Sequence, residues 1–193
     1  MPPNSPVSPY RSDKDFRVQQ GDIYRDVTLV DWAHGEDQVV VTASRDFPFV
    51  VVLTQDCDLF QDFNNRTSGV DKHDKYLQSI LLCPAYRSAE FRTGQHLQGL
   101  NLVMENWASS TRWKLITENQ SYRHHYLPEH AVFQIPELVI DFKHFITAPR
   151  DAVYRDSFRA EYRATIAELY RENLSVRFAQ YLSRIALPET AEI

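Results

Sequence analysis

The pattern of apolar and polar residues predicts a chain made mostly of strands. Residues 21–30, "GDIYRDVTLV", alternate apolar and polar positions after a glycine, which is typical of a strand that begins at a turn. Residues 38–44, "QVVVTAS", predict a second strand. It is joined to a third at residues 49–55 through "RDFP", whose Pro48 predicts a turn or the entry to a strand. That third strand, "FVVVLTQ", is apolar on both faces, so we expect it to be covered on both sides.

Polar stretches separate these strands from the next ones. Residues 61–75 are rich in Asn, Asp, Ser and Gly, and predict a long surface loop. Residues 76–86, "YLQSILLCPAY", predict a buried strand that Pro84 stops. The pattern then weakens: it predicts a short helix at residues 97–107, a strand at "TRWKLIT", and strands at "RHHYLP" and "PELVIDFKHFIT", whereas "EYRATIAEL" fits a strand or a helix.

The two ends of the chain have different patterns. Residues 1–15 contain four prolines and predict a disordered or loosely draped tail. Residues 170–186 carry an apolar stripe at helical spacing and predict a C-terminal helix, with Pro188 just beyond it. The stripe consists of Leu174, Phe178, Tyr181, Leu182 and Ile185. Such a helix has to dock on the sheet of its own chain or on a partner.

These elements predict a single domain over residues 16–193 that is mostly β (α+β). We expect a strongly bent antiparallel sheet or barrel with one C-terminal helix against it. No run approaches the ~20 apolar residues that span a bilayer, and the N-terminus has no basic and apolar leader, so we expect a cytoplasmic protein without membrane segments. Cys57 and Cys83, each in an apolar run, suit reduced thiols better than a disulfide framework.

Composition argues against two classes of function, nucleic-acid binding by the molecule's overall charge and the use of a nucleotide cofactor. The net charge of −5 means that nucleic-acid binding would need a local basic patch. The best candidate lies in the C-terminal third, where Arg177 and Arg184 share a helix face and would hold phosphate or a partner's acidic group, unless they only flank the apolar stripe. With five glycines and no glycine-rich phosphate loop, we expect no nucleotide cofactor.

Metal binding is not expected either. There is no CxxC, HxxxH or HExxH spacing, so a zinc site would require distant residues to converge by folding. The residues available for that are Cys57, Cys83, His73, His124 and His125.

The stretch Asp56-Cys57-Asp58 directly follows the buried third strand. In a functional interpretation, Asp56 or Asp58 is an acid, a base or a partner for an arginine. In a structural interpretation, Asp58 caps a short helical turn together with Gln61, while Cys57 packs as a small hydrophobe. The flanking carboxylates disfavour a thiolate, which makes a nucleophilic Cys57 the weaker hypothesis. The sequence leaves open whether Cys57 is reactive or merely buried.

Three short motifs resemble the PemK/MazF group of SH3-like barrels. They are "GDIY" at residues 21–24, Pro48 at the start of an apolar strand, and Cys83-Pro84 at the end of the next one. The resemblance covers roughly residues 20–86, and it implies an SH3-like barrel core followed by an insertion and a docking helix. Where the family's toxins have an Arg before that proline and a Thr or Ser after the later strand, this chain has Phe47 and Ala85.

The resemblance also implies a setting and partners. It places the chain in a bacterial toxin–antitoxin, stress or phage-defence locus, with a cognate protein or a second copy as partner and with RNA as a second kind of ligand. Over its full length the chain also resembles a broad set of bacterial proteins, through the "CD" after a buried strand and the terminal "RFAQYLSRIALP". That wider resemblance implies no activity.

Two functions follow from these observations. The first is a non-catalytic SH3-like barrel that binds a protein partner, which the replacement of both expected catalytic positions favours. The second is a metal-independent endoribonuclease that cleaves single-stranded RNA, with Arg45, Asp58 and Arg87 as candidate catalytic contacts. Neither requires a cofactor. Further candidate binding residues are Asp56, Tyr86, Arg177 and Arg184.

Overall fold

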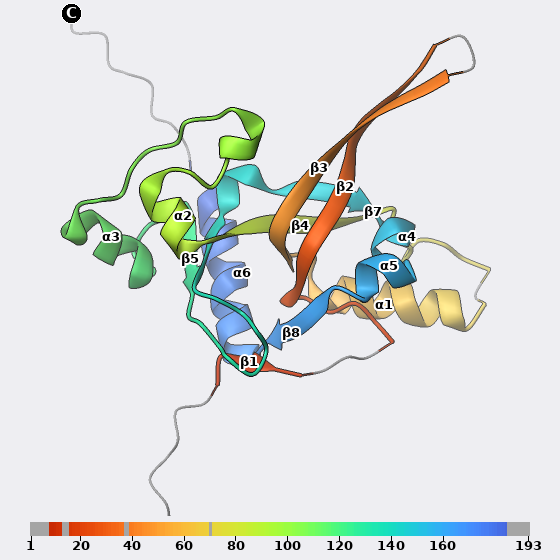
Figure 1. The fold of residues 1–193 in the computed structure, drawn as a ribbon. Coiled ribbons are helices and arrows are strands. Elements are labelled where there is room, and N and C mark those ends of the chain that lie inside the picture. The colour runs from red at the N-terminus through yellow and green to blue at the C-terminus, as the bar shows by residue number, and fades with distance from the viewer. Residues whose placement is uncertain (1–7, 13–15, 37–38, 70, 185–193) are drawn as a thin grey trace, which may run out of the picture.

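A computed structural model describes residues 8–12, 16–36, 39–69 and 71–184, with the backbone alone within residues 31–41. In these residues the fold is mixed α/β, with one curled antiparallel sheet of eight strands and six α-helices (Figure 1). The strand order is β1-β8-β2-β3-β4-β6-β5, and β7 pairs with β4. None of the helices in this part of the chain has the length and apolar character needed to cross a membrane.

The elements follow one another closely along the chain. The strands are β1 (Tyr10–Arg11), β2 (Asp22–Glu36), β3 (Val39–Val52), β4 (Ser79–Arg87), β5 (His124–Leu127), β6 (Leu138–Asp141), β7 (Ile146–Pro149) and β8 (Tyr162–Ile166). The helices are α1 (Asp56–Thr67), α2 (Ser88–Thr93), α3 (Ser110–Thr117), α4 (Arg150–Val153), α5 (Asp156–Arg159) and α6 (Glu168–Leu182), with two short 3-10 helices η1 (Gln98–Leu100) and η2 (Phe142–His144).

Strand β3 lies at the centre of the sheet and is buried on both faces, as predicted. Phe49 and Val51 belong to the core cluster under α6, whereas Val50 and Val52 belong to a second cluster that includes residues of α1, α4 and α5. All four side chains are inaccessible to solvent. Because successive residues of a strand point to opposite faces, this continuous apolar run requires helices on both sides of the sheet.

The two prolines that were expected to interrupt strands lie inside them. Strand β3 continues through Pro48, so "RDFP" forms neither the turn nor the start of a new strand that were considered for it. Strand β4 continues past Pro84 to Arg87, so the predicted strand end is also wrong. The ladder between β2 and β3 skips Pro48 and the opposite residue, Asp26, whose φ is 56°. Pro84 lies where β4 changes neighbour from β7 to β6. Both positions tolerate a residue without an N–H group.

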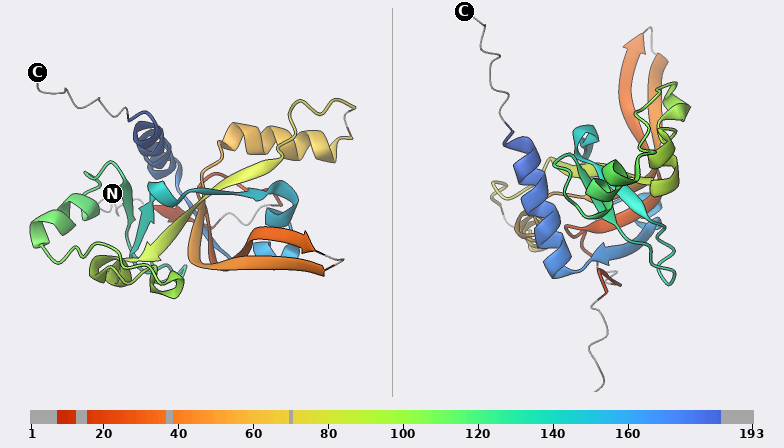
Figure 2. Two further views of the ribbon diagram at one scale, coloured as in Figure 1. Left: turned by 90° about the horizontal axis from the view of Figure 1, so that it is seen from above. Right: turned by 90° about the vertical axis from the view of Figure 1, so that its left-hand side faces the viewer.

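The outer parts of β2 and β3 form an arm that projects from the rest of the molecule (Figures 1 and 2). Strand β2 pairs with β8 only over residues 22–24, and β3 pairs with β4 only over residues 49–52. Beyond these segments the two strands pair only with each other within the described residues. The sheet is therefore curled at its base and reduced to a two-stranded ribbon at the arm.

Two segments predicted as loop and strand are helices. Helix α1 occupies the first half of the loop predicted at residues 61–75, and "TRWKLIT" forms α3. The buried side of α1 contains an acid: Asp62 is inaccessible and accepts hydrogen bonds from Arg66 Nε at 2.7 Å, Arg150 Nε at 2.8 Å and the Leu77 N–H at 2.9 Å. Apolar spacing alone does not predict a helix whose buried side includes a charged residue.

The N-terminal segment is part of the sheet. Tyr10 is buried, β1 pairs with β8, and the Tyr10 hydroxyl donates to the Pro128 carbonyl at 2.6 Å. The predicted tail at residues 1–15 is therefore wrong for residues 8–12, while residues 1–7 and 13–15 lie outside the described residues.

Helix α6 docks on its own sheet, one of the two surfaces considered for it. Leu174 and Phe178 are buried, and the Phe178 ring lies 5.4 Å from that of Phe142. Leu182, which was predicted in the apolar stripe, is 54% exposed, and Ile185 lies outside the described residues. The helix is also shorter than predicted, since it ends at Leu182.

Phe178→Ala should destabilise the fold by about 3 kcal/mol, because it removes a buried ring between α6 and the sheet. Val176→Ala, on the exposed side of the same helix, should change the free energy of unfolding by less than about 0.5 kcal/mol. Urea unfolding of both variants measures this. Equal losses of unfolding free energy in the two variants would contradict the docking face assigned to α6.

Candidate functional site

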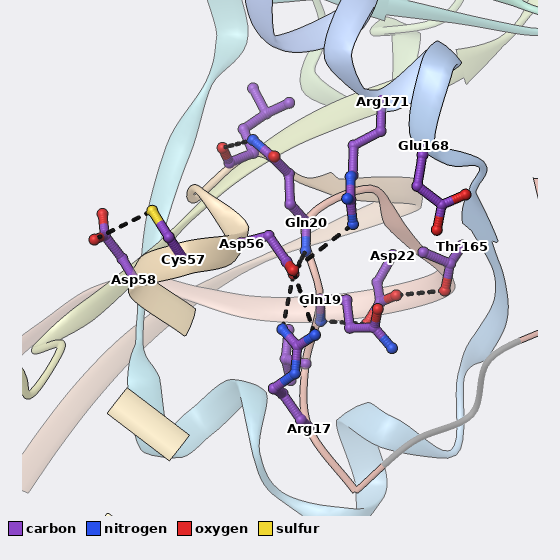
Figure 3. A network of polar contacts seen from close by, with 12 residues as sticks. Arg17, Gln19, Gln20, Asp22, Asp56, Cys57, Asp58, Thr165, Glu168 and Arg171 are labelled. Atoms are coloured by element: carbon purple, nitrogen blue, oxygen red, sulfur yellow. Dashed lines mark hydrogen bonds and ion pairs between the residues drawn. The ribbon is translucent and has the colours of Figure 1, made fainter. Parts of the chain in front are cut away.

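The Asp56 carboxylate belongs to an internal ion-pair network (Figure 3). Arg17 donates from Nη1 to Oδ1 at 2.7 Å and from Nη2 to Oδ2 at 3.3 Å, the Gln20 N–H donates to Oδ1 at 3.2 Å, and Arg171 Nη1 of α6 lies 3.8 Å from Oδ2. Burial would raise the pKa of Asp56, but the hydrogen bonds and charge of Arg17 outweigh it and the pKa is lowered. Its role here is to join three segments of the chain.

Asp22 of the "GDIY" motif forms a second buried polar centre beside the first. Its carboxylate accepts hydrogen bonds from Thr165 Oγ1 at 2.6 Å and the Gln19 N–H at 2.8 Å. Burial raises its pKa to about 7, although these donors oppose the shift. Gly21 precedes it with a φ of 84°, and a Cβ there would lie 3.1 Å from Ile166 Cβ. The motif therefore fixes a tight approach of β2 to β8.

Cys57 and Asp58 are exposed and lie away from Asp56 and its arginine partners (Figure 3). The three residues begin α1 and do not form one site. The expected cap is absent, since Gln55 holds the N-cap position without a side-chain bond. The expectation that Cys57 is packed is also wrong; Cys83 is the buried cysteine, and burial raises the pKa of its thiol.

The two candidate arginines at the C-terminal end of the described chain, Arg177 in α6 and Arg184 just beyond its end, both have contacts within the protein. Arg177 donates to the carbonyls of Asn119, Ser121 and His124 and to His125 Nδ1, so it attaches α6 to the segment around β5. Arg184 is exposed, with its guanidinium 5.6 Å from the centre of the Tyr181 ring. These contacts give Arg177 a structural role.

Among the predicted catalytic residues, Arg87 lies apart from the others. It is exposed at the end of β4 and pairs with Glu90 at 3.9 Å. The structure places Arg45 in a pocket, Asp58 at the start of α1 and Arg87 at this strand end. It therefore does not bring the three together.

Arg45 and Tyr86 do meet, in a pocket of about 320 Å³ over β3 and β4 that we call the β3–β4 pocket. Its polar lining comes from β3, β4, the loop after α2 and η2, and consists of Ser44, Arg45, Asp46, Tyr86, His96 and His144. Its apolar lining includes Phe47, Pro48, Leu97, Leu100 and Leu102. A guanidinium, a carboxylate, a phenol and two imidazoles thus line a cavity that is otherwise largely apolar, the kind of lining found in ligand sites.

A buried ion pair lies next to this pocket. The Arg123 guanidinium donates to Asp141 from Nε at 2.7 Å and from Nη2 at 2.5 Å. His144 Nδ1 lies 3.3 Å from Asp141 Oδ2 and 3.4 Å from the Tyr86 hydroxyl. Burial would raise the pKa of Asp141, but Arg123 outweighs it and the pKa is lowered. The carboxylate therefore stays ionised and holds Arg123 and His144 at the pocket.

The imidazoles at this site are held neutral at pH 7. Burial lowers the pKa of His96 to about 4 and also lowers the pKa of His144, for which the nearby charges of Arg123, Lys143 and Arg45 act in the same direction. Burial raises the pKa of Tyr86. Neither ring nitrogen of His96 makes a hydrogen bond of normal geometry with the described residues, although the Glu90 backbone is near.

The sequence indicated only part of this pocket. It named Arg45 and Tyr86 but missed His96, Asp141 and His144. The Asp141 and His144 pair has the spacing of one helical turn, but only the 3-10 turn after β6 brings the two side chains together. His96 comes from a loop without a clear pattern, so only the tertiary fold identifies it.

The described residues contain no cluster of three or more His, Cys, Asp or Glu side chains that would hold a metal ion. No protein-family model matches this chain, and no curated protein matches its sequence.

Asp56→Asn should lower the free energy of unfolding by about 1–3 kcal/mol, since it removes the charge that Arg17 and Arg171 face. Asp58→Asn is the matched control and should cost less than about 0.5 kcal/mol, because Asp58 is exposed. Chemical denaturation of the two variants tests this. A larger loss for Asp58→Asn would mean that the Asp56 network is not structural.

Stability should decrease as the pH falls from 6.5 to 5. Burial lowers the pKa of His124 to about 4 and of His125 to about 3, so the unfolded chain binds protons that the native one does not. Each of these two histidines should lower the free energy of unfolding by up to about 2 kcal/mol over this range, and His96 should lower it as well. Asp22 acts oppositely, since its native pKa is raised and protonation favours the fold.

The net loss from these groups should be roughly 2–4 kcal/mol. Urea midpoints at pH 7 and pH 5 measure it. A midpoint at pH 5 equal to or above that at pH 7 would show that these histidines are not held neutral.

Proposed function

We propose that this protein is a non-catalytic binding module with an SH3-like barrel core, and that its β3–β4 pocket receives a side chain of a protein partner. The observation that carries the proposal is the pocket itself, a mainly apolar cavity beside Arg45 in which the imidazoles are neutral at pH 7. The bacterial toxin–antitoxin or defence setting is proposed with it, on the sequence resemblance alone.

The rim of the pocket supports a protein ligand. Leu100 and Leu102 line the pocket and are also exposed, by 41% and 49%, and the neighbouring Val103 is 98% exposed. Contiguous exposed apolar residues beside a cavity are typical of surfaces that bind another protein. A hydrophobic side chain in the pocket would serve as the anchor, and a neighbouring carboxylate would face the Arg45 guanidinium.

The protonation states argue against catalysis. A general acid or base works best when its pKa is close to the working pH. The pKa of His96 is about 4, that of His144 is lowered and that of Tyr86 is raised, so each lies away from neutrality. These groups are suited to hydrogen bonding with a bound segment and are poorly suited to transferring protons.

Selection of a random peptide library on the folded protein tests the proposal. Enriched peptides should share a hydrophobic residue next to Asp or Glu. Leu102→Asp and Arg45→Ala should each weaken their binding at least tenfold, roughly the loss of one anchor contact. Val132→Asp, at an exposed apolar residue that does not line the pocket, is the matched control and should leave binding unchanged. Equal binding by all variants, or no enrichment, would contradict the proposal.

One observation favours the second candidate, a metal-independent endoribonuclease. Arg45, Tyr86 and two imidazoles share one pocket, and such groups would face a phosphate during RNA cleavage. Wild-type protein should nevertheless leave a mixed single-stranded RNA intact. Discrete fragments that are lost with both Arg45→Ala and His144→Asn, but not with Arg155→Ala, would replace the binding module with the nuclease.

A further inference from the structure

Three histidines lie where the insertion after β4 packs on the sheet. We call residues 88–117, which contain α2, η1 and α3, the flap (Figure 1). His96 belongs to the flap, His124 begins β5, and His144 ends η2. The flap is held to the sheet by a small core cluster of Tyr86, Phe91, Leu97, Ile116 and Val139. It also supplies one wall of the β3–β4 pocket, through His96, Leu97, Gly99, Leu100 and Leu102.

Two of these imidazoles are packed among aromatic rings that join the flap to the sheet. The His96 ring stacks on Phe91 at 4.4 Å between centres and lies 4.8 Å from Tyr86. The His124 ring meets the rings of Phe91 at 5.2 Å and Trp107 at 5.3 Å, both edge to face. His96 and His124 are therefore part of the contact that holds the flap closed.

The charged groups around the two rings cannot accommodate two further positive charges. Asp141 of β6 is the carboxylate that attracts both rings, and it already pairs with Arg123. Arg123 and His144 oppose protonation of both rings. From the other elements, Tyr86 of β4 is un-ionised, Arg45 and Lys143 add positive charge near His144, and Glu90 meets His96 through its backbone.

Carboxylates on the flap itself are occupied as well. Glu105 pairs with Arg112 at 2.5 Å beside Trp107, and Glu90 pairs with Arg87 at 3.9 Å. Protonated His96 and His124 would therefore face cations, aromatic rings and carboxylates that already have partners. The remaining carboxylate of the pocket, Asp46 of β3, accepts a hydrogen bond from the Thr28 hydroxyl at 2.6 Å. Burial of an uncompensated charge is costly, whereas solvent exposure removes that cost.

We propose that the flap opens at low pH. Protonation of His96 and His124 detaches residues 88–117 from the sheet and dismantles the β3–β4 pocket, while the curled sheet stays folded. The sheet has its own core clusters, which contain no residue of the flap. Opening would therefore leave those clusters intact. Any release of a bound partner rests on the proposed function, but the opening itself does not.

The direction of the pH effect follows from burial. The pKa of each ring is about 4 when the flap is closed, and opening, which exposes the ring to water, should raise it toward the ordinary value of 6.5. Between these values the open state binds a proton that the closed state does not, so falling pH favours opening. Each histidine increases the open population by roughly tenfold for each unit of pH in this range.

Hydrogen exchange of the full chain at pH 7 and pH 5, corrected for the intrinsic pH dependence of exchange, tests the proposal. Protection of amides in residues 88–117 should fall at least tenfold more than protection in β3 and β4 between the two conditions. Trp107 and Trp113 both lie in the flap, so tryptophan emission should change over the same range.

A double variant, His96→Phe with His124→Asn, should lose most of this selective change. Phe keeps the stacked ring, and Asn keeps a polar atom near Ser121, whose hydroxyl lies 2.9 Å from His124 Nδ1. If the double variant does not fold, His96→Phe alone should still reduce the selective loss by about tenfold or more. His73→Asn, at an exposed histidine outside the flap, is the control and should behave like the wild type.

Two results would overturn the proposal. One is equal loss of protection in the flap and the sheet, which would indicate global acid unfolding. The other is an undiminished flap response in the variants. Neither result depends on whether the pocket binds a peptide, because no ligand is present in the exchange measurement.

Discussion

The Asp56 carboxylate holds together parts of the chain that lie far apart in the sequence. It receives Arg17 from the segment before β2 and faces Arg171 of α6, while its own position is the first turn of α1. Asp62 does the same for α1, α4 and the segment before β4, and Asp141 holds Arg123 and His144 beside the β3–β4 pocket. The curled sheet is thus joined to its helices by buried or half-buried acids, each paired with arginine. The planar guanidinium suits this role because it donates two parallel hydrogen bonds to one carboxylate.

The ion pair between Arg123 and Asp141 also affects the charge of the histidines in the pocket. Arg123 neutralises Asp141, so the carboxylate provides too little negative charge to keep nearby histidines protonated. Burial lowers the pKa of His96 and of His144, and because Asp141 does not offset it, both imidazoles remain neutral at pH 7 in a largely apolar cavity. In the proposed function, these neutral groups would form hydrogen bonds with a bound segment.

Sequence reasoning predicted the elements whose buried face is apolar. A buried central strand was predicted at residues 49–55, and residues 49–52 of β3 form it, while residues 53–55 lie beyond its end. The docking of the C-terminal helix through Leu174 and Phe178 follows from helical spacing. Helix α1 was missed because its buried face includes Asp62, whose burial depends on Arg150 from a distant helix. Strand β1 was missed because Tyr10 is surrounded by prolines and charges, and its partner β8 lies at the other end of the chain.

The sequence likewise predicted only some of the residues of the candidate site. Arg45 and Tyr86 were named, and they lie in one pocket because neighbouring strands of the sheet carry them. Asp56 and Asp58 were interpreted from their position after a strand, but the chain turns into a helix there, which separates the two side chains. His96 and His144 have no spacing that connects them, since a flap loop and a 3-10 turn bring them to the pocket.

A histidine side-chain NMR titration of the wild-type protein measures the charge of the pocket imidazoles directly. His96 and His144 should be neutral at pH 7, with the midpoint of His96 near pH 4. A midpoint at or above pH 6.5 for either residue would contradict this protonation state, because the pocket would then hold a group suited to acid–base catalysis.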